Sequence, residues 1–371
     1  MTITDYISRA ARQLEVAGLE DPRREARMLL FEGAGLTLAE QYTHSGQELS
    51  DGLEERLLAA LERRSAREPL SSIFASAFFC GHRFALNADC LAPRPETELL
   101  VETALELLKS RLPLQPRPES GPESKPESNS ASRPALSSAS RQECSASSTE
   151  KISASRPASS SEKISGSRPA SNSELSSASS SEAKLRLELA ELCCGSAAPG
   201  LSLLWELEQR QKGVASLFLG DLSGGAIYAA MKNAAALGLE KSCRFALCDL
   251  FPPEKEETLF DLILVNPPYI PRAEISDLMP EVRDYEPHLA LDGGEDGLDF
   301  YRRLAASAAL YLKENGWLLM EHGAAQEAAI REIFADWPQG RGSAVISRRD
   351  AAGHDRVLAF QVSGRKDNGL G

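Results

Sequence analysis

The chain has 371 residues, of which 42% are hydrophobic and 26% charged, and this composition excludes a collagen, a disulfide-dense miniprotein and a wholly disordered chain. Its formal net charge of −13 weighs against tight non-specific binding to nucleic acid. No run of about 18 apolar residues and no secretory-signal pattern is visible, so we expect neither a membrane span nor a leader.

Residues 1–72 are predicted to form a small helical domain. Apolar side chains such as Ile3 and Ile7 recur at helical spacing. Asp21 followed by Pro22 is typical of a helix start, because proline is favoured at the first helical position. Nothing in this domain resembles a catalytic group.

Residues 73–112 are predicted to be a linker made of a hairpin and a connecting helix. Phenylalanines flank a turn at Gly81, which is the pattern of two short antiparallel strands. Thr97 is expected to cap the helix that runs to Lys109, since a threonine hydroxyl can accept hydrogen bonds from the first helical amides.

Residues 113–184 differ abruptly in composition from the rest of the chain. These 72 residues hold 25 serines, no aromatic residue and several repeated short units. Such a segment cannot bury enough apolar surface to offset its ordering entropy. We expect a disordered, Ser/Pro-rich insertion; the alternative is a segment that folds on a partner.

From residue 185 to the end, the chain alternates predicted strands and helices. The strand candidates are Leu185–Leu192, Val214–Leu219, Cys243–Leu247, Phe260–Val265, Trp317–Met320, Ala344–Ile346 and Arg356–Val362. Such alternation predicts an α/β fold, with a largely parallel sheet and helices on both faces. Ligands of these sheets bind beyond the carboxyl ends of the strands.

Small or acidic residues follow the first three predicted strands. Glu191–Gly200 is a small-residue turn, which lets a ligand approach the backbone and the amides of the next helix. Asp221 can accept hydrogen bonds from a ribose diol, and Asp249 can meet an adenine amino group. Each turn alone could be a helix cap or a tight connection. Three such turns, one after each of the first three predicted strands, together favour a nucleotide-type ligand.

The tetrapeptide Asn266–Tyr269 closes the fourth predicted strand and is expected to carry the chemistry. Its two prolines, Pro267 and Pro268, lack N–H groups and fix φ, which frees carbonyls to face a ligand. The Asn266 oxygen and the Pro267 carbonyl can accept both hydrogens of a planar NH2 group, on which Tyr269 can stack. The arrangement suits methylation of an amide or arylamine nitrogen; the alternative is an ordinary proline-rich turn.

Longer motifs make the chain similar to the release-factor glutamine methyltransferases, the HemK or PrmC family. The matching segments are Pro93–Glu98, Asn266–Ile270, Glu281–Pro287 and Leu291–Gly297. The resemblance covers nearly everything except residues 113–184. It implies a Rossmann-like, seven-stranded S-adenosylmethionine-dependent methyltransferase domain at 185–371, after an all-α substrate-docking domain and a β-hairpin linker.

The resemblance also implies methylation of the glutamine in the Gly-Gly-Gln motif of peptide chain release factors, with S-adenosyl-L-methionine as cofactor. Asn266, Pro267, Pro268 and Tyr269 would receive that glutamine. The residues implied to bind the cofactor are Glu191, Cys193, Cys194, Gly195, Ser196, Ala197, Asp221, Asp249, Leu250 and Asn266. Asp221 would hold the ribose, while Asp249 and Leu250 would lie by the adenine.

The first cofactor loop departs from the family's pattern, which is Asp followed by Gly-x-Gly-x-Gly. Glu191 stands for the Asp, Cys193 and Ala197 replace the outer glycines, and Gly195 remains. If Cys193 or Ala197 has a positive φ, we expect backbone strain of about 1–2 kcal/mol at that residue.

Three other functions share part of this pattern. A ribosomal-protein glutamine methyltransferase would present the same substrate group. An adenine-amino methyltransferase of DNA or RNA would need a basic groove, against which the net charge and the acidic stretch 277–295 argue. A non-catalytic binding protein would fit the altered loop, and the intact Asn266–Tyr269 speaks against it.

Cysteine usage bears on location and on metals. Seven cysteines occur without a C-x-x-C pair or zinc-ligand spacing, which favours reduced thiols in the cytoplasm and predicts no metal site. We therefore expect a cytoplasmic monomer whose partner is a protein substrate, without direct contact to nucleic acid or membrane.

Overall fold

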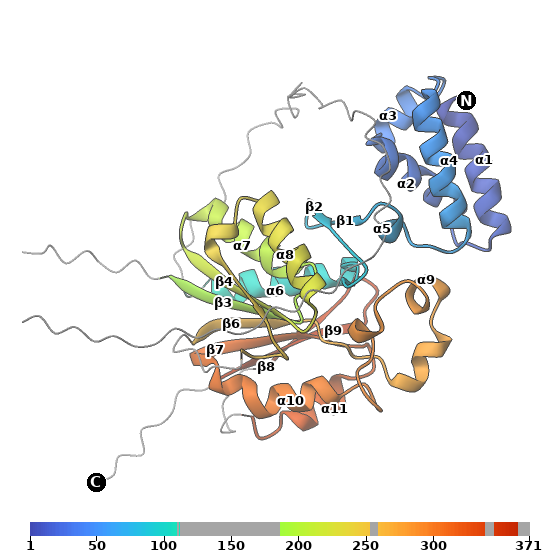
Figure 1. Ribbon diagram of the computed structural model, residues 1–371. Coiled ribbons are helices and arrows are strands. Elements are labelled where there is room, and N and C mark those ends of the chain that lie inside the picture. Colours follow the sequence, from blue (N-terminus) through green and yellow to red (C-terminus); the bar gives the residue numbers. More distant parts are fainter. Residues whose placement is uncertain (110, 112–185, 253–258, 338–344, 363–371) are drawn as a thin grey trace, which may run out of the picture. The chain divides into compact units, whose positions relative to one another are not determined.

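The computed structural model describes residues 1–109, 111, 186–252, 259–337 and 345–362 (Figure 1). The predicted insertion at 113–184 lies outside the described residues. All described residues belong to one compact unit, formed by Met1–Arg117 and Lys184–Gly371. Within them, no helix has both the length and the apolar character needed to cross a bilayer.

The N-terminal part of the described chain is helical, as predicted. Its helices are α1 (Ile3–Val16), α2 (Pro22–Ala34), α3 (Leu38–Thr43), α4 (Asp51–Ser65) and α5 (Leu70–Ile73). Thr2 and Thr37 form capping boxes at the starts of α1 and α3, and Asp21 caps α2 directly before its proline. The apolar faces enclose a core around Tyr6, whose hydroxyl donates to the Leu57 carbonyl at 3.1 Å.

The linker contains the predicted hairpin and helix. Strands β1 (Ser76–Phe79) and β2 (His82–Ala85) pair antiparallel, and the 3-10 turn η1 (Pro95–Thr97) leads into α6 (Glu98–Leu108). The expected capping role of Thr97 is wrong, because its side chain makes no cap hydrogen bond. A capping residue is typically extended, whereas Thr97 has helical dihedral angles because η1 runs directly into α6.

A buried amide joins the hairpin to the sheet domain. Asn233 in α8 (Gly224–Ala236) accepts a hydrogen bond from the Ala85 amide at 2.7 Å and donates to the Ala85 carbonyl at 3.0 Å. The same side chain donates to the Ser196 carbonyl at 2.9 Å. One residue therefore holds both the linker and the first predicted cofactor loop.

Ion pairs join the helical domain to the short helix α9 (Pro280–Arg283). Glu281 accepts from Arg64 at 3.2 Å and from Arg67 at 2.8 Å, and both arginines follow or end helix α4. The Tyr285 hydroxyl donates to the Ala66 carbonyl at 3.0 Å. The motif segment 281–287 thus contacts the end of α4.

Seven strands of the described chain form one sheet, at the seven predicted places. They are β3 (Leu187–Leu192), β4 (Ala215–Asp221), β5 (Cys243–Leu247), β6 (Phe260–Val265), β7 (Leu312–Glu321), β8 (Val345–Arg349) and β9 (Asp355–Gln361). The order is β5-β4-β3-β6-β7-β9-β8, with β9 antiparallel to both neighbours and the other pairs parallel. The predicted seven-stranded Rossmann-like fold is confirmed.

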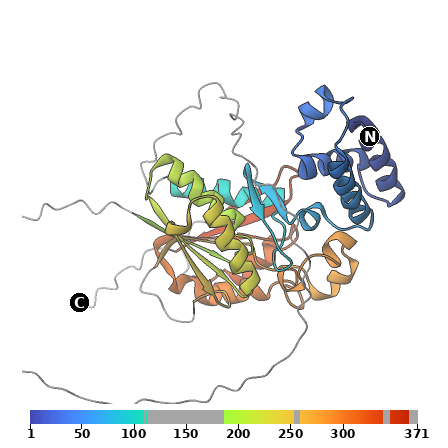
Figure 2. The same cartoon turned by 45° about the horizontal axis from the view of Figure 1, so that its top comes forward.

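Helices cover both faces of this sheet (Figures 1 and 2). Helices α6, α7 (Ala198–Arg210) and α8 pack on one face, while α10 (Asp299–Ser307) and α11 (Glu327–Ile333) pack on the other. Helix α10 passes directly into the 3-10 turn η5 (Ala308–Leu310). Further 3-10 turns are η2 (Glu240–Ser242), η3 (Arg272–Asp277) and η4 (His288–Ala290).

Candidate active site

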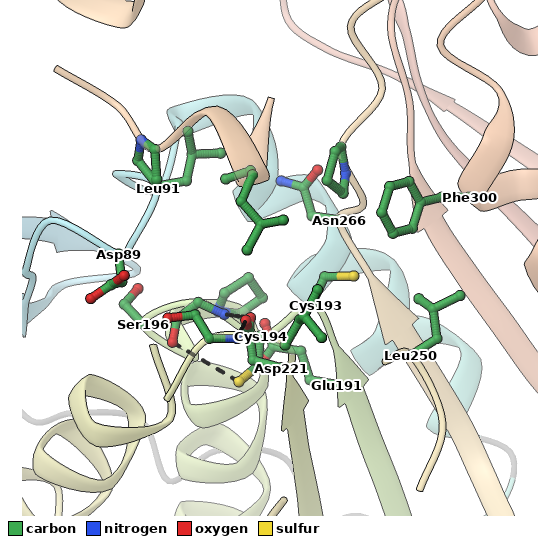
Figure 3. A pocket seen from close by; sticks show the side chains of 18 of the residues that line it. Asp89, Leu91, Glu191, Cys193, Cys194, Ser196, Asp221, Leu250, Asn266 and Phe300 are labelled. Carbon is green, nitrogen blue, oxygen red and sulfur yellow. Dashed lines mark hydrogen bonds between the residues drawn. The ribbon is translucent and has the colours of Figure 1, made fainter. Parts of the chain in front are cut away.

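A cavity opens at the carboxyl edge of the sheet, beside β3 and β6, where the strand order reverses (Figure 3). The predicted site residues that line it are Glu191, Cys193, Cys194, Gly195, Ser196, Asp221, Asp249, Leu250, Asn266 and Pro268. Ala197, Pro267 and Tyr269 do not contribute to the lining. Ala197 is fully buried at the start of α7, Pro267 is buried, and Tyr269 is half-buried against the core.

Three residues of the loop after β3 have left-handed backbone angles, which cost conformational energy in residues other than glycine. The φ angles of Cys193, Gly195 and Ala197 are 53°, 52° and 60°. Because φ is positive at both positions where a glycine is replaced, we expect backbone strain of about 1–2 kcal/mol at Cys193 and again at Ala197. Burial raises the pKa of the Cys193 and Cys194 thiols, which therefore present neutral surfaces.

Asp221 at the end of β4 organises this loop. Its two carboxylate oxygens accept hydrogen bonds from the Gly195 amide at 2.8 Å and the Ser223 amide at 2.9 Å. Burial raises the pKa of Asp221, and the hydrogen bonds from these amides oppose that rise. The carboxylate lines the cavity, and its contact with a ribose stays a prediction.

Glu191 at the end of β3 is buried beneath the same loop. Its Oε2 accepts a hydrogen bond from the Gly200 amide at 2.9 Å, and Gly200 has no room for a Cβ beside it. Burial raises the pKa of Glu191 to about 8, the Gly200 amide lowers it, and the charge of Asp221 raises it. The glutamate therefore fills the space between the strand and α7.

The predicted adenine side of the cavity combines an ion pair with apolar walls. Asp249 pairs with Arg303 at 2.7 Å, and its side chain is 59% exposed. Leu250 is buried with a φ of 66°. Phe300, which lies beside Leu250 in Figure 3, lines the same end, and Arg303 lies 5.4 Å above its ring. That Asp249 contacts adenine stays a prediction.

Asn266 lies across the cavity from Asp221 (Figure 3). It directly follows the buried strand β6, whose carboxyl end positions it. Gln326 fixes the backbone of the tetrapeptide, because its Nε2 donates a hydrogen bond to the Tyr269 carbonyl at 2.9 Å. Burial raises the pKa of Tyr269 to about 12, so this side chain stays a neutral phenol.

The glycine-rich motif Leu291–Gly297 supports the same tetrapeptide. The Ile270 amide donates to the Leu291 carbonyl at 3.1 Å, and the Gly293 amide donates to the Ile270 carbonyl at 2.9 Å. A Cβ on Gly293 would meet the Tyr269 backbone at 2.8 Å. Glycine is therefore required here by the close approach of two backbones.

Several cavity residues were not predicted from the sequence. They are Asp89, Leu91, Pro93, Thr97, Pro199, Leu222, Ser223, Cys248, Pro287, Leu289, Ala290 and Phe300. Four of them belong to the linker, which is far from the sheet domain in the sequence but lies at the edge of the sheet in the structure. The motif Pro93–Glu98 was the one signal for this wall; Asp89 and Leu91 belong to no pattern that would have found them.

Comparisons with known proteins agree with this architecture. The family described as PrmC N-terminal domain matches residues 5–74. The chain is 31% identical to the release factor glutamine methyltransferase of Cereibacter sphaeroides, over 98% of this chain and 99% of the relative. It is 30% identical to the protein of the same name from Agrobacterium fabrum, over 97% of each chain.

The crystal structure of a release factor-specific protein-(glutamine-N5) methyltransferase from Alicyclobacillus acidocaldarius matches with a TM-score of 0.33 and 20% identity. The match covers 76% of this chain and 100% of that one.

Proposed function

The chain belongs to the release factor glutamine methyltransferase family, and we propose that it methylates the side-chain amide nitrogen of the glutamine in the Gly-Gly-Gln motif of peptide chain release factors. The methyl donor is S-adenosyl-L-methionine. The observation that carries the proposal is the position of Asn266, an amide on the cavity wall across from Asp221 and the loop after β3.

The cavity suits this cofactor. The Asp221 carboxylate lies on its wall, and Thr97 also lines it with a buried hydroxyl that has no hydrogen-bond partner among the described residues. A ribose diol and an ammonium group both need such acceptors, and Leu250 and Phe300 offer apolar surface to a base. The residues proposed to bind it are Glu191, Cys193, Cys194, Gly195, Ser196, Ala197, Asp221, Asp249, Leu250 and Asn266.

When bound, the cofactor supplies an electrophilic methyl group. The protein's own contribution is to orient a poor nucleophile, because an amide lone pair is delocalised. Asn266 Oδ1 and the Pro267 carbonyl are proposed to accept the two hydrogens of the substrate NH2 group, with Pro268 and Tyr269 bounding its plane. Fixing those hydrogens directs the nitrogen lone pair toward the donor, which is catalysis by position and electrostatics.

We further propose that residues 1–72 dock the folded release factor while the cavity receives its loop. Binding energy from the docked domain can then hold one glutamine in place. The acidic net charge supports a protein partner without direct nucleic-acid contact. We also propose a cytoplasmic monomer; the free thiols at all cysteines of the described residues support the cytoplasmic location.

The test offers labelled S-adenosylmethionine with purified release factor, ribosomes or DNA to the full chain. We expect one methyl group on the Gly-Gly-Gln glutamine of release factor, located by mass spectrometry. Label in ribosomal protein alone would favour the ribosomal-protein alternative, and label in adenine would favour the nucleic-acid alternative.

In the same assay, Asn266→Ala should lower kcat by about 100- to 1000-fold, the loss seen when one preorganised contact to the reacting group is removed. Cofactor binding, measured by calorimetry, should stay within a few-fold of wild type. Wild-type turnover by this variant would contradict the role proposed for Asn266.

A further inference from the structure

Glu321 is a buried acid behind the cavity that the proposed chemistry does not yet use. It is the last residue of β7 and only 2% exposed. Its Oε2 has no hydrogen-bond partner among the described residues, and the Thr97 hydroxyl, also 2% exposed, has none either. Thr97 lines the cavity whereas Glu321 does not.

The sheet brings Glu321 next to Asn266. In the parallel pair β6–β7, Val265 is opposite Met320, so the next residue of each strand lies at the same edge and on the same face. Turn η1 brings Thr97 to the same place, and the polar side chains of Thr97 and Asn266 both favour the charged form of Glu321. Neither makes a bond of regular geometry to Oε2; such bonds are often long without ligand and tighten in the complex.

The remaining neighbours of Glu321 fix its backbone and its charge. The Tyr301 hydroxyl donates to the Glu321 carbonyl at 2.9 Å. The positive charge of Arg356 favours the ionised carboxyl and the negative charge of Glu96 disfavours it. Tyr269 and Tyr301 also face it, but burial raises the pKa of both phenols, so neither titrates near neutrality.

We propose that Glu321 is a positioning residue, whose carboxylate accepts hydrogen bonds from the Asn266 NH2 group and the Thr97 hydroxyl and so turns Asn266 Oδ1 toward the substrate amide. A carboxylate only accepts hydrogen bonds, so it selects the NH2 end of a neighbouring amide. The assignment rests on the proposed function of Asn266. It also gives the linker a role, because Thr97 and Asn266 share one anchor.

Protonation of Glu321 should reverse this selection, because a carboxylic acid can donate to Asn266 Oδ1 and occupy the atom that the substrate needs. Burial raises the pKa of Glu321 to about 7. The ionised, active form therefore accumulates as pH rises through about 7, and kcat should rise with it to a plateau.

The test compares Glu321→Gln with Glu314→Gln, an exposed glutamate on the same strand. For Glu321→Gln we expect kcat on release factor to fall at least ten-fold, the step in the pH profile near 7 to vanish, and cofactor affinity to stay within two-fold. Glu314→Gln should keep the wild-type rate and profile. Wild-type kcat and an unchanged pH step in Glu321→Gln would overturn the assignment.

Two further measurements keep the inference separable from folding and from the substrate. Thr97→Val should lower kcat, and Thr97→Ser, which keeps the hydroxyl, should lower it less; equal losses would count against a shared anchor. In wild-type protein, the NMR signals of the Asn266 side-chain NH2 should shift with pH around 7 without any substrate. Absence of that shift would overturn the inference, whereas inactivity of wild type on release factor would overturn only the proposed function.

Discussion

Two residues of the loop after β3 have a backbone conformation that favours glycine. Cys193 and Ala197 both have positive φ, so the condition under which the sequence predicts backbone strain is met. The local pattern was informative because a strand-to-helix turn at a ligand leaves few backbone choices. The position of Asp89 and Leu91 in the cavity wall could not be predicted, because it depends on packing between segments far apart in the sequence.

Ala197→Gly should therefore destabilise the protein much less than a buried alanine-to-glycine change in a helix. Relief of left-handed strain, about 1–2 kcal/mol, offsets the entropic cost of a glycine, about 0.5–1 kcal/mol, and the lost burial of one methyl group, about 0.8 kcal/mol. We expect the free energy of unfolding in urea to change by less than about 1 kcal/mol. Ala10→Gly in α1, which is equally buried but has no positive φ, should lower it by more because nothing offsets these costs. Equal effects of the two substitutions would contradict the strain.

Glu191 should make stability depend on pH. Its pKa is about 8 in the folded protein and 4.5 as an ordinary glutamate, so the folded state binds the extra proton between these values. The free energy of unfolding then falls as pH rises from 4.5 to 8, by up to about 1.4 kcal/mol per pH unit.

Glu191→Gln should remove that slope while keeping an acceptor for the Gly200 amide. We expect the variant to be more stable than wild type at pH 7.5 and equal to it below pH 4.5, in urea unfolding series across this range. Glu332→Gln, at an exposed site, supplies the control and should follow wild type. Parallel curves for Glu191→Gln and wild type would show that Glu191 is not buried as a neutral acid.

At the scale of elements, the strands were predictable and the contacts between distant elements were not. Apolar runs such as Phe260–Val265 carry their own signal, because a strand buried on both faces is apolar throughout. Thr97 was misjudged because the 3-10 turn before α6 gives it helical dihedral angles. The sequence around Glu281 contains no pattern that predicts its ion pairs with Arg64 and Arg67, which lie more than 200 residues away.

That pairing predicts a weakened domain contact in Glu281→Ala. The substitution leaves two partly buried guanidinium groups without this partner, and hydrogen bonds to charged groups are worth about 1.5–3 kcal/mol. We expect a lower urea midpoint and faster proteolysis at residues 66–69. Asp284→Asn, which breaks an exposed pair with Arg283, should change stability by less than about 1 kcal/mol. Similar effects of both would deny Glu281 a special role.

At the scale of the whole molecule, the two parts that flank residues 113–184 fold together. Helix α6 precedes this segment and β3 follows it, yet both contribute to one core cluster. The flanking residues Met1–Arg117 and Lys184–Gly371 form one compact unit. That residues 113–184 add nothing to the core stays a prediction from composition, because the segment lies outside the described residues.

Deletion of residues 113–184 with a short flexible linker should therefore preserve folding and release-factor methylation. Loop-closure entropy changes by only about 0.6 kcal/mol for each doubling of length. Thermal unfolding and the methyl-transfer assay provide the comparison with the full chain. A well-folded deletion that had lost methylation of release factor would assign a function to the segment.

The position of α6 ahead of that segment has a consequence for synthesis on the ribosome. Its apolar side chains, among them Leu100, Ala104 and Leu108, are buried in a core that includes β3 residues. Strand β3 is translated about 80 residues after α6, which at 5–20 residues per second takes roughly 4–16 s. During that interval the apolar face of α6 cannot pack against β3. The nascent chain therefore exposes apolar surface that chaperones can bind and that favours aggregation.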